Sequence, residues 1–126
     1  MHAVSRFSAD LASVAGARSW LATQLRPLAP SALVNDAQLC LSELAANAVN
    51  HAGSDFEVEV RRFDDRLRIT VSDESDERPV LRSVDPSSQR GRGLLIVDAV
   101  SQRWGVTAHE PTGKSVWCEL PLDGSP

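Results

Sequence analysis

The sequence predicts an α+β fold, a two-layer sandwich in which helices cover one face of a mixed, mainly antiparallel sheet. Two long segments before Gly53 carry apolar residues at steps of three and four, the period of a helix with one buried face. After Gly53 the period changes to two, in pairs of alternating runs joined by short polar turns, as in antiparallel hairpins. The resulting order of helix, helix, hairpin, long loop, helix and hairpin disfavours a doubly wound parallel sheet.

The first predicted helix runs from about Ser8 to Arg26 and ends at the prolines that follow. The second starts at Ser31, expected as its N-cap, and reaches about Ala52, where Gly53 provides a C-terminal stop. A polar stripe lies directly beside the apolar face of the second helix rather than opposite it. Its members are Asp36, Cys40, Glu43, Asn47 and Asn50. We therefore expect this stripe at the rim of the core, where a cleft could form.

The second half of the chain predicts two hairpins separated by a loop and a helix. The first hairpin pairs alternating runs at residues 56–61 and 66–71. Residues 73–93 show no sustained period, and a loop of that length in a compact domain is usually functional or disordered. A short apolar helix at residues 94–102 and a hairpin between residues 104 and 120 complete the predicted fold.

Length and composition fit one folded domain. The chain has 126 residues, of which 42% are hydrophobic and 24% charged, close to the averages for soluble proteins. We expect a single domain over residues 1–122 and a short tail at residues 123–126. No apolar run approaches the roughly 20 residues of a membrane span and no signal peptide is evident, so we expect a cytoplasmic protein without membrane contact. Cys40 and Cys118 lack the spacing of a disulfide framework or a zinc site and are expected as small core residues.

The charge distribution indicates one segment suited to anions. The formal net charge of −4 argues against direct nucleic-acid binding, but residues 78–93 carry four arginines and one aspartate. Gly91, Arg92 and Gly93 end this basic segment directly before the helix expected at Leu94. Glycines and the free N–H groups of a helix start suit a phosphate. Taken alone, the same residues also fit a flexible linker into a helix cap.

Four further residues are candidates for site chemistry, and each has a structural alternative. Glu43 and Asn47 lie four residues apart on one helix face, so they could act as a general base and a Mg²⁺ ligand, or form only a surface hydrogen bond. Asp73 ends a strand, either as a buried acceptor for an exocyclic amine or as a turn residue. Lys114 follows Gly113 as in a P-loop, but the strand pattern after it contradicts that motif and favours a β-turn with an exposed lysine.

Four segments, taken in order, resemble the ATP-binding family shared by histidine kinases, gyrase and the mismatch-repair ATPases, often called GHKL. They are residues 43–52 (ELAANAVNHA), which resemble its N box, 71–73 (VSD), its first adenine-side box, 91–94 (GRGL), its lid glycine box, and 113–117 (GKSVW), its last strand box. The resemblance covers about residues 31–121 and implies a Bergerat-type ATP-binding fold. Within that family, this short single-domain chain is similar to the anti-sigma-factor serine/threonine kinases of Gram-positive bacteria.

The resemblance implies a role for each matched residue. Glu43 would be the base that activates a serine hydroxyl, Asn47 would coordinate Mg²⁺ at the phosphates, and Asp73 would accept a hydrogen bond from the adenine amino group. The other nucleotide-binding residues would be Gly91, Arg92, Gly93, Leu94 and Lys114. The basic loop that ends at Gly93 would be the nucleotide lid. The family usually has D-x-G-x-G after the strand, whereas residues 73–77 read DESDE, which predicts weaker nucleotide binding.

The resemblance also implies a function. The chain is expected to use ATP and Mg²⁺, to bind a sigma factor, and to phosphorylate an anti-sigma-factor antagonist on serine, with homodimerisation as a further expectation. Two alternatives stay open: a non-catalytic interaction module that binds ATP or ADP to order its lid, and a separated histidine kinase-like ATPase domain that hydrolyses ATP slowly. A complete sensor histidine kinase is not expected, because the sequence contains no helical dimerisation segment with a phosphoacceptor histidine.

Overall fold

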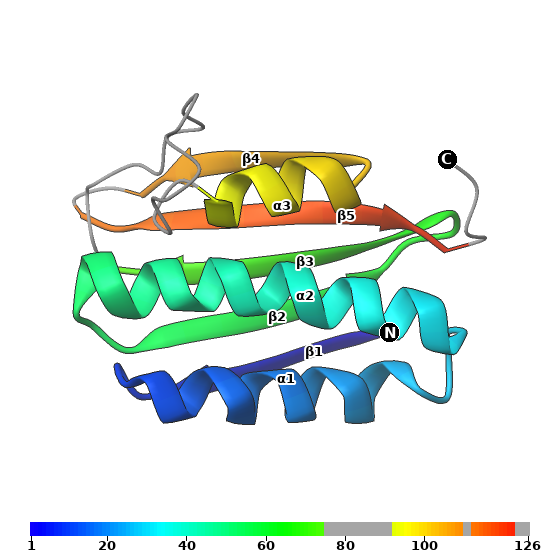
Figure 1. Ribbon diagram of the computed structural model, residues 1–126, viewed down its shortest axis with the longest axis horizontal. Coiled ribbons are helices and arrows are strands. Elements are labelled where there is room, and N and C mark those ends of the chain that lie inside the picture. The colour runs from blue at the N-terminus through cyan, green and yellow to red at the C-terminus, as the bar shows by residue number, and fades with distance from the viewer. Residues whose placement is uncertain (75–91, 110–111, 123–126) are drawn as a thin grey trace.

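The structure, a computed structural model, describes residues 1–74, 92–109 and 112–122. Its elements are β1 (His2–Phe7), α1 (Leu11–Leu25), α2 (Ser31–Asn47), the π-helical turn η1 (Ala48–Ala52), β2 (Phe56–Arg62), β3 (Arg66–Asp73), α3 (Arg92–Val100), β4 (Arg103–Ala108) and β5 (Lys114–Pro121). The strands form one sheet in the order β1-β2-β3-β5-β4. The three α-helices lie on the same side of that sheet (Figure 1). This arrangement confirms the predicted α+β sandwich.

The sheet differs from the prediction in its pairing and in its first strand. Every strand pair among the described residues is antiparallel, so the sheet is not mixed. Residues 2–7, for which the sequence predicts no strand, form β1, and Phe7 at its end stacks on Phe56 of β2 with ring centroids 5.5 Å apart. The helix α1 begins later, where Asp10 caps it by accepting a hydrogen bond from the Ser13 N–H at 3.0 Å. Pairing with β2 therefore decides the conformation of the N-terminal segment.

The second helix confirms its predicted end and corrects its predicted start. Pro30 occupies the N-cap position and offers no side-chain hydrogen bond, so Ser31 is the first helical residue rather than the cap. The helical path continues through η1 to Ala52 and stops at Gly53, whose φ of 62° lies in the left-handed region. Glycine enters that region without steric strain, which explains the stop.

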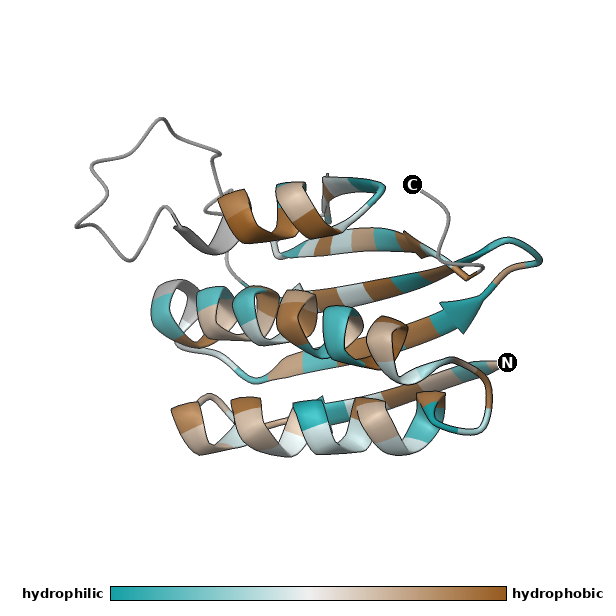
Figure 2. Ribbon diagram, turned by 45° about the vertical axis from the view of Figure 1, so that its right-hand side comes forward, coloured by the Kyte–Doolittle hydropathy of each residue, from teal (hydrophilic) through white to brown (hydrophobic). Residues whose placement is uncertain are grey.

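The core fills the space between the sheet and the helices. The inner face of the sheet carries the alternate strand residues, and Val60, Ile69 and Cys118 lie side by side in the antiparallel register with no exposed surface. Cys40 of α2 is also fully buried and its thiol is free, so both cysteines are core residues as predicted. The alternation of hydrophobic and hydrophilic residues along the strands is visible in Figure 2. Within the described residues, no helix combines the length and the apolarity that crossing a bilayer requires.

Candidate functional site

The topology brings the predicted site segments to one end of the molecule. The end of α2 with η1, the end of β3, the start of α3 and the start of β5 all lie at that end (Figure 1). The helix α2 packs over β3 and β5 on the inner face of the sheet, and η1 contacts β3. Segments that are far apart in the sequence are therefore close together here, as the predicted site requires.

A buried ion pair joins the end of β3 to the start of β5. The register places Asp73 directly opposite Lys114, and the lysine Nζ lies 3.0 Å from the aspartate Oδ1. The two side chains are only 2% and 5% exposed, respectively. Asp73 is buried and accepts from Lys114, and its role as an acceptor for an exocyclic amine stays a prediction. The prediction of Lys114 as an exposed turn residue is wrong. A charge taken out of water is tolerated only with a partner, which explains why the two ionic groups meet.

Gly113 allows this pair to form. Its φ is 104°, and a Cβ at this position would lie 2.8 Å from the carbonyl oxygen of Asp73. Any other side chain would push the start of β5 away from the end of β3 and strain the backbone. The carbonyl of Gly113 also accepts a hydrogen bond from the His109 N–H at 2.9 Å, which closes the connection from β4. The glycine thus sets the position of Lys114.

Glu43 and Asn47 lie one turn apart on α2, both half-buried. Of the predicted polar stripe, Cys40 lies inside the core and Asp36 is exposed, so the stripe crosses the rim of the core as expected. Burial raises the pKa of the Glu43 carboxyl above its ordinary value of 4.5. A carboxylate with a raised pKa is a stronger base, which suits a residue that takes up a proton.

The predicted phosphate-binding residues are the first residues of a helix. The helix α3 begins at Arg92 rather than at Leu94, so Arg92, Gly93 and Leu94 form its first turn instead of preceding it. The first four N–H groups of a helix lack intrahelical acceptors, and the helix dipole favours an anion there. The predicted lid runs from about residue 76 to Gly93, and its residues up to Gly91 lie outside the described residues, so the roles of Gly91 and of the lid stay predictions.

A second connection, which the sequence does not indicate, ties the end of α2 to the end of β3. The backbone N–H of Glu74 donates to the Ser54 Oγ at 3.2 Å, directly after η1 and Gly53. Single turns of π-helix in α-helices are rare in proteins, but many of those that occur lie at functional sites. Local periodicity does not distinguish such a turn from α-helix, so only the structure reveals it. The helix that carries Glu43 and Asn47 is thereby fixed beside Asp73.

A comparison of the chain with known families finds one matching family model. The family model described as histidine kinase-like ATPase domain matches residues 7–119. The match extends from the end of β1 into β5 and therefore includes every candidate residue named above. No curated protein matches the chain.

Proposed function

The chain belongs to the histidine kinase-like ATPase family, and from this membership we propose that it is an ATP-binding regulatory protein of the anti-sigma-factor type. In this proposal it binds a sigma factor and transfers the γ-phosphate of ATP to a serine of an anti-sigma-factor antagonist. The observation that carries the nucleotide part is the buried pair of Asp73 and Lys114 at the end of the sheet. The resemblance of residues 43–52 and 91–94 to the single-domain kinases supports the regulatory part.

The pair of Asp73 and Lys114 suits adenine because it places an acceptor beside a donor. Adenine offers the complementary edge, an amino group that donates next to the ring nitrogen N1, which accepts. Asp73 would accept from the amino group while Lys114 donates to N1. Guanine exchanges the two functions, since its O6 accepts and its N1 donates, so the order of acceptor and donor would select adenine. Because both side chains are buried, these charge-assisted hydrogen bonds would form in a medium of low dielectric constant.

The phosphates would lie at the start of α3, where the first backbone N–H groups are available to an anion. Asn47 would offer its amide oxygen to Mg²⁺. A single amide oxygen fits this ion, because Mg²⁺ usually keeps several waters and takes phosphate oxygens beside one or two protein ligands. When bound, Mg²⁺ would neutralise charge on the phosphates during transfer.

Glu43 would act as the general base for phosphoryl transfer. Its carboxylate would remove the proton from the serine hydroxyl as the serine oxygen bonds to the γ-phosphorus. The bond between that phosphorus and the bridging oxygen breaks, and ADP leaves with the electron pair. The burial that raises the pKa of Glu43 would strengthen it for this step.

The experiment that tests this proposal separates nucleotide binding from transfer. We expect ATP and ADP to bind by titration calorimetry in the presence of Mg²⁺, and Asn47→Ala to reduce the Mg²⁺-dependent part of the binding. With radiolabelled ATP and a candidate antagonist, the parent should label a serine, whereas Glu43→Gln should bind nucleotide and lose transfer. Glu57→Gln, a change at an exposed glutamate of β2, is the matched control and should bind nucleotide and transfer phosphate as the parent does.

Two results would contradict parts of the proposal. If neither ATP nor ADP binds, the nucleotide part is wrong. If nucleotide binds and no antagonist is labelled, the chain is a nucleotide-binding module or a separated ATPase domain rather than a protein kinase. Light scattering on the same samples tests the expected homodimer, and pull-down of a sigma factor with and without nucleotide tests that partner.

A further inference from the structure

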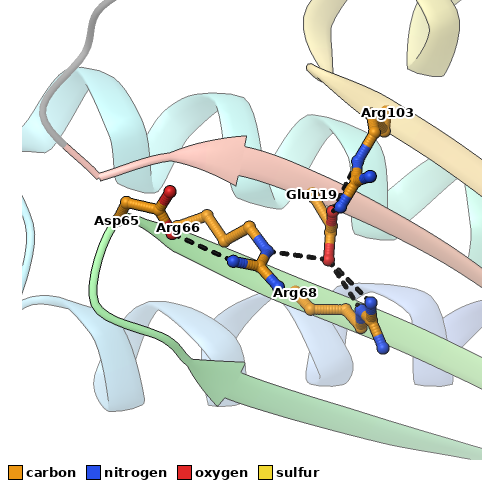
Figure 3. Close-up of polar contacts among 5 residues, drawn as sticks. All are labelled: Asp65, Arg66, Arg68, Arg103 and Glu119. Carbon is orange, nitrogen blue, oxygen red and sulfur yellow. Dashed lines mark hydrogen bonds and ion pairs between the residues drawn. The ribbon is translucent and has the colours of Figure 1, made fainter.

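The sheet face that points away from the helices carries three arginines on one carboxylate. Glu119 of β5 has no exposed surface although it lies on this outer face. Its Oε2 accepts from the Nε of Arg66 at 3.0 Å and of Arg68 at 2.9 Å, both on β3, and its Oε1 accepts from the Nε of Arg103 on β4 at 2.9 Å (Figure 3). We name Arg66, Arg68 and Arg103 the arginine cluster. Glu119 is buried because these three side chains cover it.

The arginine cluster holds more positive charge and more donors than Glu119 can use. Burial raises the pKa of Glu119, but hydrogen bonds from the cluster outweigh burial and hold that pKa below 4.5, so the carboxylate is ionised. Asp65 adds a second carboxylate, whose Oδ1 accepts from the Nη1 of Arg66 at 3.0 Å, so two carboxylates face three guanidinium groups. Each guanidinium has five N–H donors. Among the described residues, the Nη1 groups of Arg68 and Arg103 have no protein acceptor. Both side chains reach solvent, with exposed fractions of 37% and 61%.

Aromatic rings orient two members of the arginine cluster, Arg66 and Arg68. The Arg68 guanidinium carbon lies 5.0 Å from the centre of the Trp117 ring, and that of Arg66 lies 4.3 Å from the Phe63 ring. Trp117 itself lies against β4 at Gly105, where a Cβ would come within 2.6 Å of the indole. Guanidinium groups held by both a carboxylate and a ring lose less freedom when they bind a ligand. Arginine and tryptophan are also the residue types that most often dominate binding energy at interfaces.

The neighbouring strand limits the kind of ligand that fits. On the same outer face, β2 presents Glu57, Glu59 and Arg61, and Arg61 lies opposite Arg68. The face is therefore basic over β3, β5 and β4 and at Arg61 of β2, and it is acidic where β2 carries Glu57 and Glu59. A long polyanion crossing the sheet would meet these carboxylates, whereas a short acidic segment can remain over the basic part. Carboxylates and guanidinium groups form two parallel hydrogen bonds in a fixed geometry, which gives such a segment a defined position.

We propose that the arginine cluster is a docking site for an acidic segment of a partner protein, whose carboxylates pair with Arg68 and Arg103. The site lies on the opposite face of the sheet from Asp73 and Lys114, which face the helices. It does not depend on the nucleotide proposal, and either proposal can fail without the other.

The test uses the whole chain labelled with ¹⁵N and a short peptide of alternating glutamate and serine as the probe. We expect the peptide to shift the signals of the Trp117 indole N–H and the Nε–H groups of the arginine cluster, with an affinity that falls as salt rises. A peptide with glutamine in place of glutamate should leave them unchanged. Arg103→Gln removes the most exposed cation of the cluster and should weaken binding about fivefold. Arg18→Gln, at an exposed arginine of α1, is the matched control and should bind as the parent does.

Three outcomes would overturn the proposal. The first is that the acidic peptide shifts none of these signals in the parent. The second is that the glutamine peptide shifts them equally, or that Arg18→Gln weakens binding as much as Arg103→Gln. The third is that a single-stranded oligonucleotide displaces the acidic peptide and binds more tightly, which would make the surface a phosphate-backbone site. The titrations of the parent with the two peptides decide the question even if Arg103→Gln fails to fold.

Discussion

Replacing Lys114 by methionine tests the buried pair on which the nucleotide proposal depends. Methionine fills a similar volume but removes the ammonium that lies 3.0 Å from Asp73, while the carboxylate remains 2% exposed. Removal of one partner of a buried ion pair typically lowers the free energy of unfolding by about 3–5 kcal/mol, because a buried charge loses its counter-ion. Since the total for a domain is about 5–15 kcal/mol, we expect a large shift of the urea unfolding midpoint for Lys114→Met.

The double variant and a matched control make this prediction specific. Asp73→Asn combined with Lys114→Met removes both charges, so it should recover part of the stability that Lys114→Met loses. Arg18→Met, which removes an exposed cation of α1, should change the free energy of unfolding by less than about 0.5 kcal/mol. Two results would show that the two residues do not act as a buried ion pair. One is that Lys114→Met is as stable as Arg18→Met. The other is that the double variant is less stable than the sum of the two single changes predicts. ATP titration of Lys114→Met at a temperature where it is folded should show weaker binding, since the donor to adenine N1 is lost.

Three further predictions concern Glu119, Glu43 and Gly113. Because the native pKa of Glu119 is lowered, its ionised form stabilises the fold above about pH 4.5, and this stabilisation is lost as the pH falls through the lower native pKa. Urea unfolding should therefore show Glu119→Gln less stable than the parent at pH 7, with a difference that shrinks in acid; a difference independent of pH would contradict this. Burial of Glu43 disfavours its ionised form, so at pH 7 Glu43→Gln should unfold no more easily than the parent. Phosphoryl transfer by the same variant should fall by roughly two to four orders of magnitude, because the general base is lost. Gly113→Ala should destabilise the fold by about 1–3 kcal/mol in thermal unfolding. Gly16→Ala, inside α1 with nothing within 4 Å of the new Cβ, is the control and should stabilise the fold. Similar effects of the two changes would refute the close approach at Gly113.

The sequence predicts the elements whose residues repeat at a regular step. The apolar face of α2 and the alternating strands β2, β3 and β5 follow directly from periods of 3.6 and two, because each buries one face. The strand β1 does not follow, because its residues have no strong alternation and pair with β2 only in the folded chain. The helix cap at Pro30 rather than Ser31 differs by one residue, since proline and serine both favour the start of a helix.

The candidate site depends on pairings that local periodicity does not contain. Lys114 next to Gly113 fits a surface turn until β5 is placed beside β3, which puts the lysine opposite Asp73 on the inner face. From the sequence, Glu119 likewise fits a solvent-exposed residue on the outer face of a strand. It is buried because Arg66, Arg68 and Arg103 reach over it from the two neighbouring strands. Both residues carry charge, and both are buried by partners more than ten residues away in the sequence.

The strands β3 and β5 separate the two proposed sites. Successive side chains of a strand point to opposite faces, so Asp73 and Lys114 face the helices while Ser72 and Ser115, one residue earlier and one later, meet on the outer face with their Oγ atoms 2.6 Å apart. Further along the same strands, Arg68 and Glu119 lie on that outer face. A nucleotide at the inner end and an acidic partner on the outer face therefore do not compete for space. The backbone of these two strands joins the two sites, and its end is fixed by the approach of Gly113 to Asp73.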